Sequence, residues 1–547
     1  MKRKEMERRD FLRTLAAGVP ILALNWDAFP RGDSAKSASN EWDALIIGAG
    51  LGGLSCAAAF ARQGFRPLVL EQHAVPGGYA TTFQRPGGFV FDASLHSTTV
   101  GERNGVYNLI AGFPEITEVE FVPHPSLYRA IFPEHDLRVP QRDPAGYAAE
   151  LKRLFPEEAA AIDNLLAAMK GLAEDVEKYS AVEGKANMMN FPQEFPNLFQ
   201  AFSRTWGQFM DLYVANPKLR AVVTVLWEYF GLPPSKLAAL YYALPAWGYL
   251  TAGGYYPKGK SQAISNALVR FIESKGGKVL LHTRVEKILT ADHAVTAVRT
   301  ADGREYKGRV VVANANVPDV FRKMLDEGEF LKEYLARLDT FSPSFSSFQV
   351  FLGLNRDLVG GLGIRDSEIF YATGYDPEAD YRASQAADVG KGSVGITLYD
   401  NIYAGYSPKG KNTLTLIALQ GYDHWLPYEA DYFKGEKAAY RQEKERLADI
   451  IIDRIEKALL PGLRKAIAVK EIATPLTNVR YTRNWRGAIY GWDQTLDNAL
   501  PRRLGQRTPI KNLFLAGAWT TPGGGYGAVI PSGLQCFAEI MKDWSQK

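Results

Sequence analysis

The sequence predicts an α/β protein in which a Rossmann-type domain carries a second, discontinuous α+β domain. One glycine-rich loop lies between an apolar strand and a small-residue helix at residues 43–64, and a second glycine-rich, uncharged stretch lies near the C-terminus at residues 512–536. The 547 residues exceed one ordinary hydrophobic core, so two intertwined domains are expected.

The N-terminal arm, residues 1–39, is predicted to be an export signal. Arg8 and Arg9 precede an uncharged run of 13 residues from Thr14 to Trp26, which is too short to span a bilayer core of about 30 Å. The order of basic, apolar and small-residue segments resembles a twin-arginine translocation signal. A basic amphipathic tail is the alternative. We expect an exported, periplasmic or membrane-associated protein rather than a cytoplasmic one.

Residues 44–71 have the pattern of a dinucleotide-binding βαβ unit. An apolar strand ends at Ile47, a helix runs to Gln63, and a second strand, residues 67–70, ends at Glu71. Between the first strand and the helix stand four glycines, each with room for a close backbone approach: Gly48, Gly50, Gly52 and Gly53. The first allows the tight turn, the second admits a pyrophosphate, and the last lets the helix pack on the strand.

The cofactor is predicted to be FAD. Glu71, 18 residues after Gly53, can accept both hydroxyls of an adenosine ribose, and its charge repels a 2′-phosphate. The doublet Gly77-Gly78 follows, as in flavoproteins of the glutathione-reductase type. No second G-x-G-x-x-G unit with a helix after it is present, so no NAD(P) domain is expected.

The C-terminal stretch is predicted to cover the flavin. "NLFLAG" is a strand ending at Gly517, and a helix from Ala528 can stabilise negative charge at the flavin ring. We expect Gly517, Ala518, Gly527 and Ala528 to contact the cofactor. Many flavoproteins have an Asp after this strand's Gly, where this chain has Ala518.

His96 is the candidate for proton transfer, because a neutral imidazole can serve near pH 7. The alternative is a hydrogen-bonded structural histidine. Asp92 is expected to support the turn that carries His96.

Four segments of the chain show a common family pattern: "DALIIGAGLGGLSCAAAFARQGFRPLVLEQHAVPGGYATTFQRPGGFVFDASLH", "GGYYPKGKSQAISNALVRFIESKGGKVLLHTRVEKIL", "GAIYGWDQTL" and "LFLAGAWTTPGGGYGAVIPSG". These segments resemble the phytoene desaturase, carotenoid isomerase and retinol saturase family. The motif "LEQH…GG…FD…LH" is nearest the retinol saturase branch, and Lys260 stands where the family usually has Gly. The resemblance implies that the backbone at Val285 meets the adenine.

The FAD-binding domain is therefore expected at residues 40–101, 250–325 and 470–547, and a substrate or lid domain at 102–249 and 326–469. Aromatic residues of the first insertion could line a lipophilic tunnel or simply pack in the core: Trp227, Tyr229, Phe230, Tyr241, Tyr242, Trp247 and Tyr249.

Composition excludes other classes of function. The first 39 residues hold eight Lys/Arg and five acids, or +3 of the net charge of +4, so the remainder is near neutral and does not suit nucleic acid. Two cysteines and seven histidines show no ligand spacing, so no metal site is expected.

We expect a FAD-dependent oxidoreductase that desaturates, saturates or isomerises a long apolar polyene or isoprenoid. A quinone or another acceptor would take its electrons at a membrane surface. An amine-oxidase-like flavoenzyme and a non-catalytic flavin-binding protein are the alternatives.

The export signal gives the first test. Replacing Arg8 and Arg9 with Lys keeps the charge but removes the pair that the twin-arginine pathway reads, so the variant should stay in the cytoplasm, folded and yellow. Cell fractionation measures this, and unchanged export of the Lys pair would mean another route.

Overall fold

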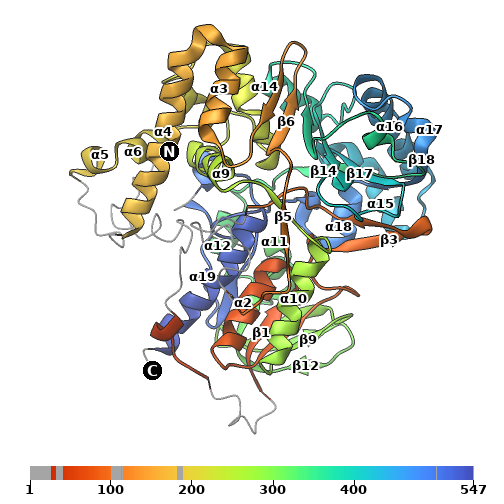
Figure 1. Ribbon diagram of the computed structural model, residues 1–547. Coiled ribbons are helices and arrows are strands. Elements are labelled where there is room, and N and C mark those ends of the chain that lie inside the picture. Colours follow the sequence, from red (N-terminus) through yellow and green to blue (C-terminus); the bar gives the residue numbers. More distant parts are fainter. Residues whose placement is uncertain are drawn as a thin grey trace.

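The computed structural model describes residues 26–32, 41–99, 113, 115–181, 189–499 and 502–545. Arg8, Arg9 and the rest of the twin-arginine segment up to residue 25 lie outside the described residues. Figure 1 shows a lower region built on a parallel sheet and two upper regions, one helical and one with a mixed sheet in which most neighbouring strands are antiparallel.

A five-stranded parallel sheet forms the lower region, in the order β19-β13-β1-β2-β9. Its strands come from distant parts of the chain: β1 (Trp42–Ile47), β2 (Pro67–Leu70), β9 (Lys278–Leu280), β13 (Gly308–Ala313) and β19 (Leu513–Leu515). The first strand lies at the centre between β13 and β2, all in parallel register. The Rossmann-type fold class is thus confirmed.

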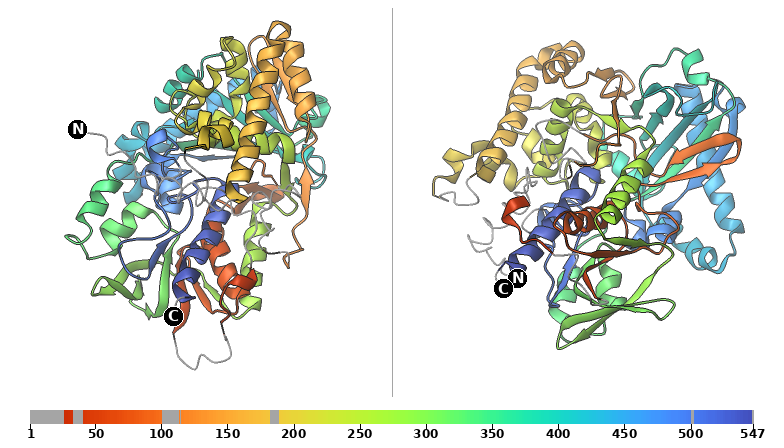
Figure 2. Two further views of the ribbon diagram at one scale, coloured as in Figure 1. Left: turned by 90° about the vertical axis from the view of Figure 1, so that its left-hand side faces the viewer. Right: turned by 60° about the horizontal axis from the view of Figure 1, so that its bottom comes forward.

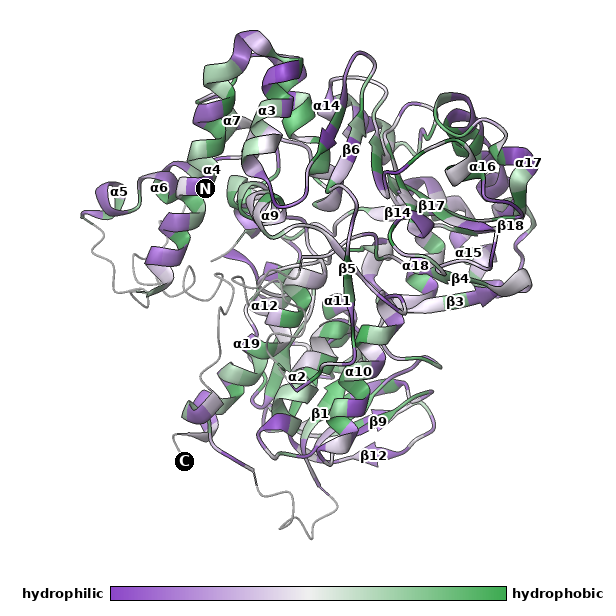
Figure 3. Cartoon of the chain, in the orientation of Figure 1, coloured by the Kyte–Doolittle hydropathy of each residue, from purple (hydrophilic) through white to green (hydrophobic). Residues whose placement is uncertain are grey.

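Helices α2 (Leu51–Arg62), α10 (Ser261–Ser274) and α19 (Tyr526–Trp544) cover one face of this sheet. In Figure 3 these helices carry much hydrophobic colour, because their inner faces pack on one another and on the sheet. A Cβ at Gly533 of α19 would lie 2.2 Å from the carbonyl oxygen of Gly52, so α2 and α19 pack at backbone distance. Cys56 and Cys536, both free, are buried in these two helices, as expected of packing residues.

The other face of the sheet packs against a three-stranded antiparallel sheet of β10 (Val285–Ala291), β11 (Ala294–Thr300) and β12 (Glu305–Tyr306). The turn formed by α11 (Val317–Asp319) and the π-helical residues Val320–Met324 completes this layer.

A seven-stranded sheet forms the upper right region, in the order β18-β14-β17-β16-β15-β6-β7. Its strands are β6 (Tyr128–Ile131), β7 (Asp136–Val139), β14 (Ser346–Leu354), β15 (Glu368–Tyr371), β16 (Val394–Leu398), β17 (Asn412–Gln420) and β18 (Ile467–Ala473). Both predicted insertions contribute strands, which makes this domain discontinuous as expected. The strand β18 crosses the expected boundary at residue 470 and pairs with β14.

One face of this sheet packs on α15 (Leu426–Lys434), α16 (Ala438–Ala458) and α18 (Pro475–Thr482). Alternate residues such as Ile369, Ile396 and Leu416 point into that core. The alternate positions in between point to the opposite face, where Phe370 and Leu419 pack on the core of the helical region.

The upper left region is helical and has its own core. It holds α3 (Pro144–Leu154), α4 (Ala159–Ala181), α5 (Phe191–Glu194), α6 (Pro196–Phe202), α7 (Trp206–Met210), α8 (Pro217–Val223) and α9 (Ala239–Ala252). The two further views show both upper regions on the same side of the parallel sheet (Figure 2).

The remaining elements are short. They are β3 (Thr82–Arg85), β4 (Phe89–Asp92), β5 (Phe121–Pro123), β8 (Tyr255–Pro257), α12 (Lys332–Leu338), α13 (Leu358–Gly361), α14 (Pro377–Gln385) and α17 (Leu463–Ala466). Among the described residues, no helix is both long and apolar enough to cross a bilayer.

Candidate FAD site and substrate cavity

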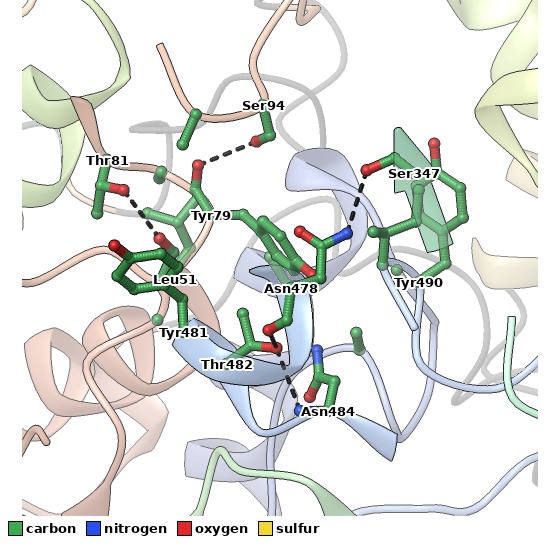
Figure 4. A pocket seen from close by; sticks show the side chains of 18 of the residues that line it. Leu51, Tyr79, Thr81, Ser94, Ser347, Asn478, Tyr481, Thr482, Asn484 and Tyr490 are labelled. Atoms are coloured by element: carbon green, nitrogen blue, oxygen red, sulfur yellow. Dashed lines mark hydrogen bonds between the residues drawn. The ribbon is translucent and has the colours of Figure 1, made fainter. Parts of the chain in front are cut away.

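One cavity of 1440 Å³ lies where the three regions meet. Its lining includes the glycine loop after β1, the start of α19, the helix α9 and one face of the seven-stranded sheet. In the close view of Figure 4, residues from α2, α18 and β14 surround the same space, and the Asn478 amide donates to the Ser347 hydroxyl.

The glycine loop forms one wall of the cavity. Gly48, Gly50 and Gly52 line it, whereas Gly53 lies behind the loop, where a Cβ would come within 2.2 Å of the Gly48 carbonyl oxygen. Gly48 has a φ of 94°, the left-handed conformation that favours glycine. The missing side chains leave the start of α2 open to a phosphate.

The glycine doublet lies directly against this loop. Gly77 forms a parallel bridge with Gly50, and its N–H donates to the Ala49 carbonyl oxygen at 2.7 Å. Gly77 and Gly78 both line the cavity.

Asn314, which the sequence analysis missed, lies at the crossing of three loops. Its side chain donates to the Gly48 carbonyl oxygen at 3.3 Å, and its Oδ1 would lie 2.8 Å from a Cβ at Gly52 and 2.3 Å from one at Gly517. Gly517 therefore shapes this crossing and does not line the cavity. The position of Asn314 directly after β13, at the carboxyl edge of the sheet, is a signal that could have found it.

Glu71 is buried at the end of β2 and faces the cavity. Its Oε2 accepts from the Ala49 N–H at 2.7 Å, and its Oε1 accepts from the His73 N–H at 2.8 Å. Each carboxylate oxygen has a second lone pair, so the group can still accept a ribose hydroxyl. Val285 and His73 line the same end of the cavity.

The C-terminal segment lines the cavity at Ala518, Gly527 and Ala528. The helix α19 begins at Tyr526, two residues before the expected start, and the Tyr526 hydroxyl donates to the Tyr79 carbonyl oxygen at 3.2 Å. The positive end of the helix dipole therefore opens onto the cavity.

These features fit FAD. Three features line the one cavity. They are the glycine loop after β1, where no side chain blocks a close approach, the carboxylate of Glu71 at the end of β2, and the start of helix α19. Glu71 would hold the adenosine ribose, the α2 start the pyrophosphate, and the α19 start the flavin ring. The roles of the individual residues stay predictions.

Lys260 shows how this chain accommodates its departure from the family motif. Its φ of 67° lies in the left-handed region that glycine adopts freely. The ammonium lies 3.4 Å from the centre of the Tyr406 ring and donates to the Tyr406 carbonyl oxygen at 3.2 Å. Burial lowers the pKa of Lys260 to about 8.

The substrate end of the cavity is mostly apolar. Of the seven predicted tunnel aromatics, Tyr229, Phe230, Tyr241 and Tyr249 line it. The other three do not line this cavity, and Tyr242 stacks on Trp206 in the helical core at 4.5 Å. Core packing therefore describes Tyr242 better than a tunnel wall.

The seven-stranded sheet lines the cavity with alternate residues, since strand side chains alternate between faces. On four neighbouring strands the lining positions are Ser347, Gln349, Phe351, Ile417, Leu419, Gly395, Glu368 and Phe370. Glu368, also missed by the sequence analysis, is a buried carboxyl on this face. Burial raises its pKa to about 8.

His96 lines the cavity and is buried beside Thr397, with 2.5 Å between His96 Nδ1 and the Thr397 hydroxyl oxygen. Burial lowers the pKa of His96 to about 4, so its imidazole is neutral near pH 7. Asp92 accepts from the Leu95 N–H at 3.2 Å and from the Tyr256 hydroxyl at 2.6 Å, which confirms that it supports the turn carrying His96.

No group of His, Cys, Asp and Glu that could hold a metal ion occurs among the residues that the structure describes.

This fold and cavity define a FAD-dependent oxidoreductase. The chain matches the family model of the flavin containing amine oxidoreductases over residues 51–541, and it belongs to that family.

The relatives agree with the resemblance seen in the sequence. The chain is 26% identical over 522 residues to the all-trans-retinol 13,14-reductase of Danio rerio, covering 89% of this chain and 84% of the relative. It is 26% identical over 532 residues to the chloroplastic prolycopene isomerase 1 of an Oncidium hybrid cultivar, covering 92% of this chain and 84% of the relative. These matches confirm the predicted retinol saturase and carotenoid isomerase relationship.

Among solved structures, putrescine oxidase bound to putrescine matches with a TM-score of 0.60 at 15% identity, over 93% of this chain and 99% of that one. This likeness shows the shared fold.

Glu71 gives a test of the cofactor site. Glu71→Ala removes the acceptors for the ribose, and because a hydrogen bond to a charged group contributes about 1.5–3 kcal/mol, FAD affinity should fall about tenfold or more per bond lost. Flavin absorbance relative to protein absorbance after dialysis measures the loss. Glu71→Gln, which keeps one acceptor oxygen, should retain more FAD, and exposed Glu305→Ala should retain all of it. Full FAD content in Glu71→Ala would refute this assignment.

Proposed function

We propose that this FAD-dependent oxidoreductase adds or removes hydrogen at a carbon–carbon bond of a long apolar polyene or isoprenoid. The observation that carries the proposal is the apolar end of the cavity, continuous with the FAD site and lined by α9 and the sheet. The relatives that act on retinol and prolycopene by name support it.

The electrostatics of the cavity favour an uncharged ligand. Two carboxyls line the substrate end, Glu228 and Glu368, and both are buried. Burial raises the pKa of Glu228 and raises that of Glu368 to about 8, so it favours the uncharged acids over carboxylates at this end of the cavity.

The bound flavin supplies hydride transfer. The residues of the protein stabilise charge, position the substrate and exclude water. The start of α19 stabilises negative charge beside Ala528, and α9 closes the cavity through a hydrogen bond from the Tyr241 hydroxyl to the Pro522 carbonyl oxygen. Apolar side chains from α9 and the sheet hold the chain of the substrate and exclude water.

Basic side chains at the opening of the cavity support the proposal that the protein docks on an anionic membrane. We define the basic rim as Lys437, Arg441, Lys444, Arg480 and Arg483, all of which line the cavity. Within the described parts of the chain, none of the five forms an ion pair with a carboxylate. Three exposed aromatic side chains lie close to the rim residues in sequence: Phe433 near the end of α15, Tyr481 in α18 and Trp485 two residues after Arg483.

Such a rim suits a lipid surface, where each Lys or Arg contributes about 1 kcal/mol and exposed aromatic rings enter the interface. A lipid substrate and a quinone could then reach the cavity from the membrane, and we propose a quinone as the electron partner.

We propose that the protein is exported by the twin-arginine route and keeps its arm. Trp26 and Phe29 pack on Phe537 of α19, with ring centres 6.0 and 5.3 Å away, and the Gln63 amide donates to the Trp26 carbonyl oxygen. Cleavage after residue 39 would remove these contacts.

Amine oxidation is the second candidate, favoured by the family model and by the two cavity carboxyls, which could pair with an ammonium group on ionisation. The neutral state of both groups near pH 7 makes it the weaker candidate.

An anaerobic assay separates the two. Oxidised and chemically reduced enzyme are mixed with a retinoid alcohol, a linear carotenoid and an aliphatic diamine, and flavin absorbance is followed. A polyene should change the flavin spectrum at a rate matching turnover, and the diamine should not. Ala246→Trp, which fills the cavity from α9, should lose this response but keep FAD, while exposed Ala438→Trp should behave as wild type. Reduction by the diamine alone would overturn the proposal.

The basic rim gives a separate test. Lys437→Glu, Arg441→Glu and Arg480→Glu together should abolish sedimentation with phosphatidylglycerol vesicles, which salt should also weaken. A control triple of Lys278→Glu, Lys307→Glu and Lys332→Glu changes the same charge at exposed sites away from the rim and should leave most binding intact. Equal loss in both triples would show that only net charge matters.

A further inference from the structure

A series of hydrogen-bonded side chains connects His96 to Glu368, and both of these residues line the cavity. Glu368 and Thr397 stand directly opposite each other on the antiparallel strands β15 and β16, so their side chains share the cavity face. The Thr397 hydroxyl donates to Glu368 Oε2 at 3.1 Å, and its oxygen lies 2.5 Å from His96 Nδ1. The Tyr229 hydroxyl donates to Glu368 Oε1 at 3.1 Å. Four segments far apart in sequence thus converge on one carboxyl.

The surroundings of Glu368 keep it protonated. The titratable groups that face it are Tyr229, Tyr249 from α9, Tyr399 after β16, and His96 through Thr397. Its pKa is raised mainly by burial, and the two hydrogen bonds lower it by less. Near pH 7 the carboxyl therefore carries a proton while His96 is neutral.

We propose that Glu368 is the catalytic acid and base that exchanges a proton with the substrate carbon, and that His96, acting through Thr397, is a positioning residue. This inference rests on the proposed function, because a CH–CH oxidoreductase must move a proton as well as a hydride. It moves the proton-transfer role first predicted for His96 to a carboxyl that the sequence did not indicate.

The same carboxyl serves both directions of the reaction. In saturation, bound reduced flavin would supply a hydride, with its electron pair, to one carbon of the double bond, while the O–H bond of Glu368 breaks and the other carbon receives the proton. The carboxylate left behind keeps the hydrogen bonds from Tyr229 and Thr397, and it regains a proton from water when product leaves. In desaturation the carboxylate takes the proton from one carbon, and bound oxidised flavin would accept the hydride from the other.

Thr397 allows the hydrogen bonds between His96 and Glu368 to persist when Glu368 gains or loses its proton. A hydroxyl both donates and accepts, so Thr397 donates to the carboxylate while accepting from Nδ1–H of His96, or accepts from the carboxylic acid while donating to Nδ1. Both arrangements satisfy every group between His96 Nδ1 and Glu368. His96 thereby fixes the hydroxyl in either protonation state.

Glu228 is the alternative candidate for the acid and base, since it lines the same cavity. It is buried and protonated for the same physical reason, but it also borders a second cavity of 300 Å³ near Asp380. The hydrogen bonds that would stabilise a carboxylate during turnover are those of Glu368.

Infrared difference spectroscopy tests the protonation without relying on turnover. Wild type minus Glu368→Gln at pH 7 should show the carbonyl band of a protonated carboxylic acid, shifted in heavy water and lost with a midpoint near pH 8. The exposed control Glu305→Gln should show no such band. A carboxylate signal for Glu368 at pH 7 would overturn the proposal.

Turnover with the polyene that the anaerobic assay identifies tests the role. Glu368→Gln should keep FAD and lose about a hundredfold or more in rate, as for removal of a general acid. Glu368→Asp should recover part of it. In the saturating direction the wild-type turnover rate should fall as pH rises through 8. Thr397→Val should keep FAD but shift the pH at which this rate has fallen to half.

The outcomes separate this inference from the proposed function. Two results would overturn the role of Glu368 without affecting the polyene function: a wild-type turnover rate in Glu368→Gln, or a hundredfold fall in turnover rate in Glu228→Gln alone. Absence of turnover with every polyene would refute the proposed function, whatever the infrared spectrum shows.

Discussion

The structure depends on a close approach of backbones around Asn314. The loops after β1, β13 and β19 meet there, and a Cβ at Gly48, Gly52, Gly53 or Gly517 would lie within 3 Å of Asn314 or of the loop itself. Because the three strands are neighbours in one parallel sheet, their carboxyl ends must come together. Glycines allow that crossing without displacing the start of α2 from the cavity.

The same crossing holds the C-terminal helix against α2. The Gly517 N–H donates to the Ser532 hydroxyl of α19, and the Ser55 hydroxyl of α2 donates to the Ile530 carbonyl oxygen. The starts of α2 and α19 therefore both open onto one cavity. The uncharged C-terminal stretch is ordered because it is part of this wall.

Local patterns predicted the parts of the site that lie within one segment. The βαβ unit was found because strand, loop, helix and acid follow each other within 30 residues, and the structure places β2 at the predicted residues 67–70. The turn held by Asp92 was predicted for a similar reason. Glu71, the glycine doublet and Ala528 line one cavity, and their contacts with FAD stay predictions.

Contacts between distant segments were not predictable in this way. Glu368 lies in a short strand whose sequence, "EIFY", shows no functional pattern, and its role depends on pairing with Thr397 and on Tyr229 from another region. The aromatic run near α9 had the right composition for a tunnel, but helical packing decides which rings turn inward, and Tyr242 turns toward Trp206. The strand β18 was divided by a predicted boundary because its partner β14 is more than 100 residues away in sequence.

We expect FAD and an apolar substrate to share one continuous cavity, and a crystal structure of the FAD-loaded protein with a bound polyene tests this. The ribose should lie at Glu71, the flavin ring at the start of α19, and the polyene between α9 and the sheet, in contact with Phe370 and Leu419. A polyene bound on the outer surface, or a flavin ring placed away from α19, would contradict it.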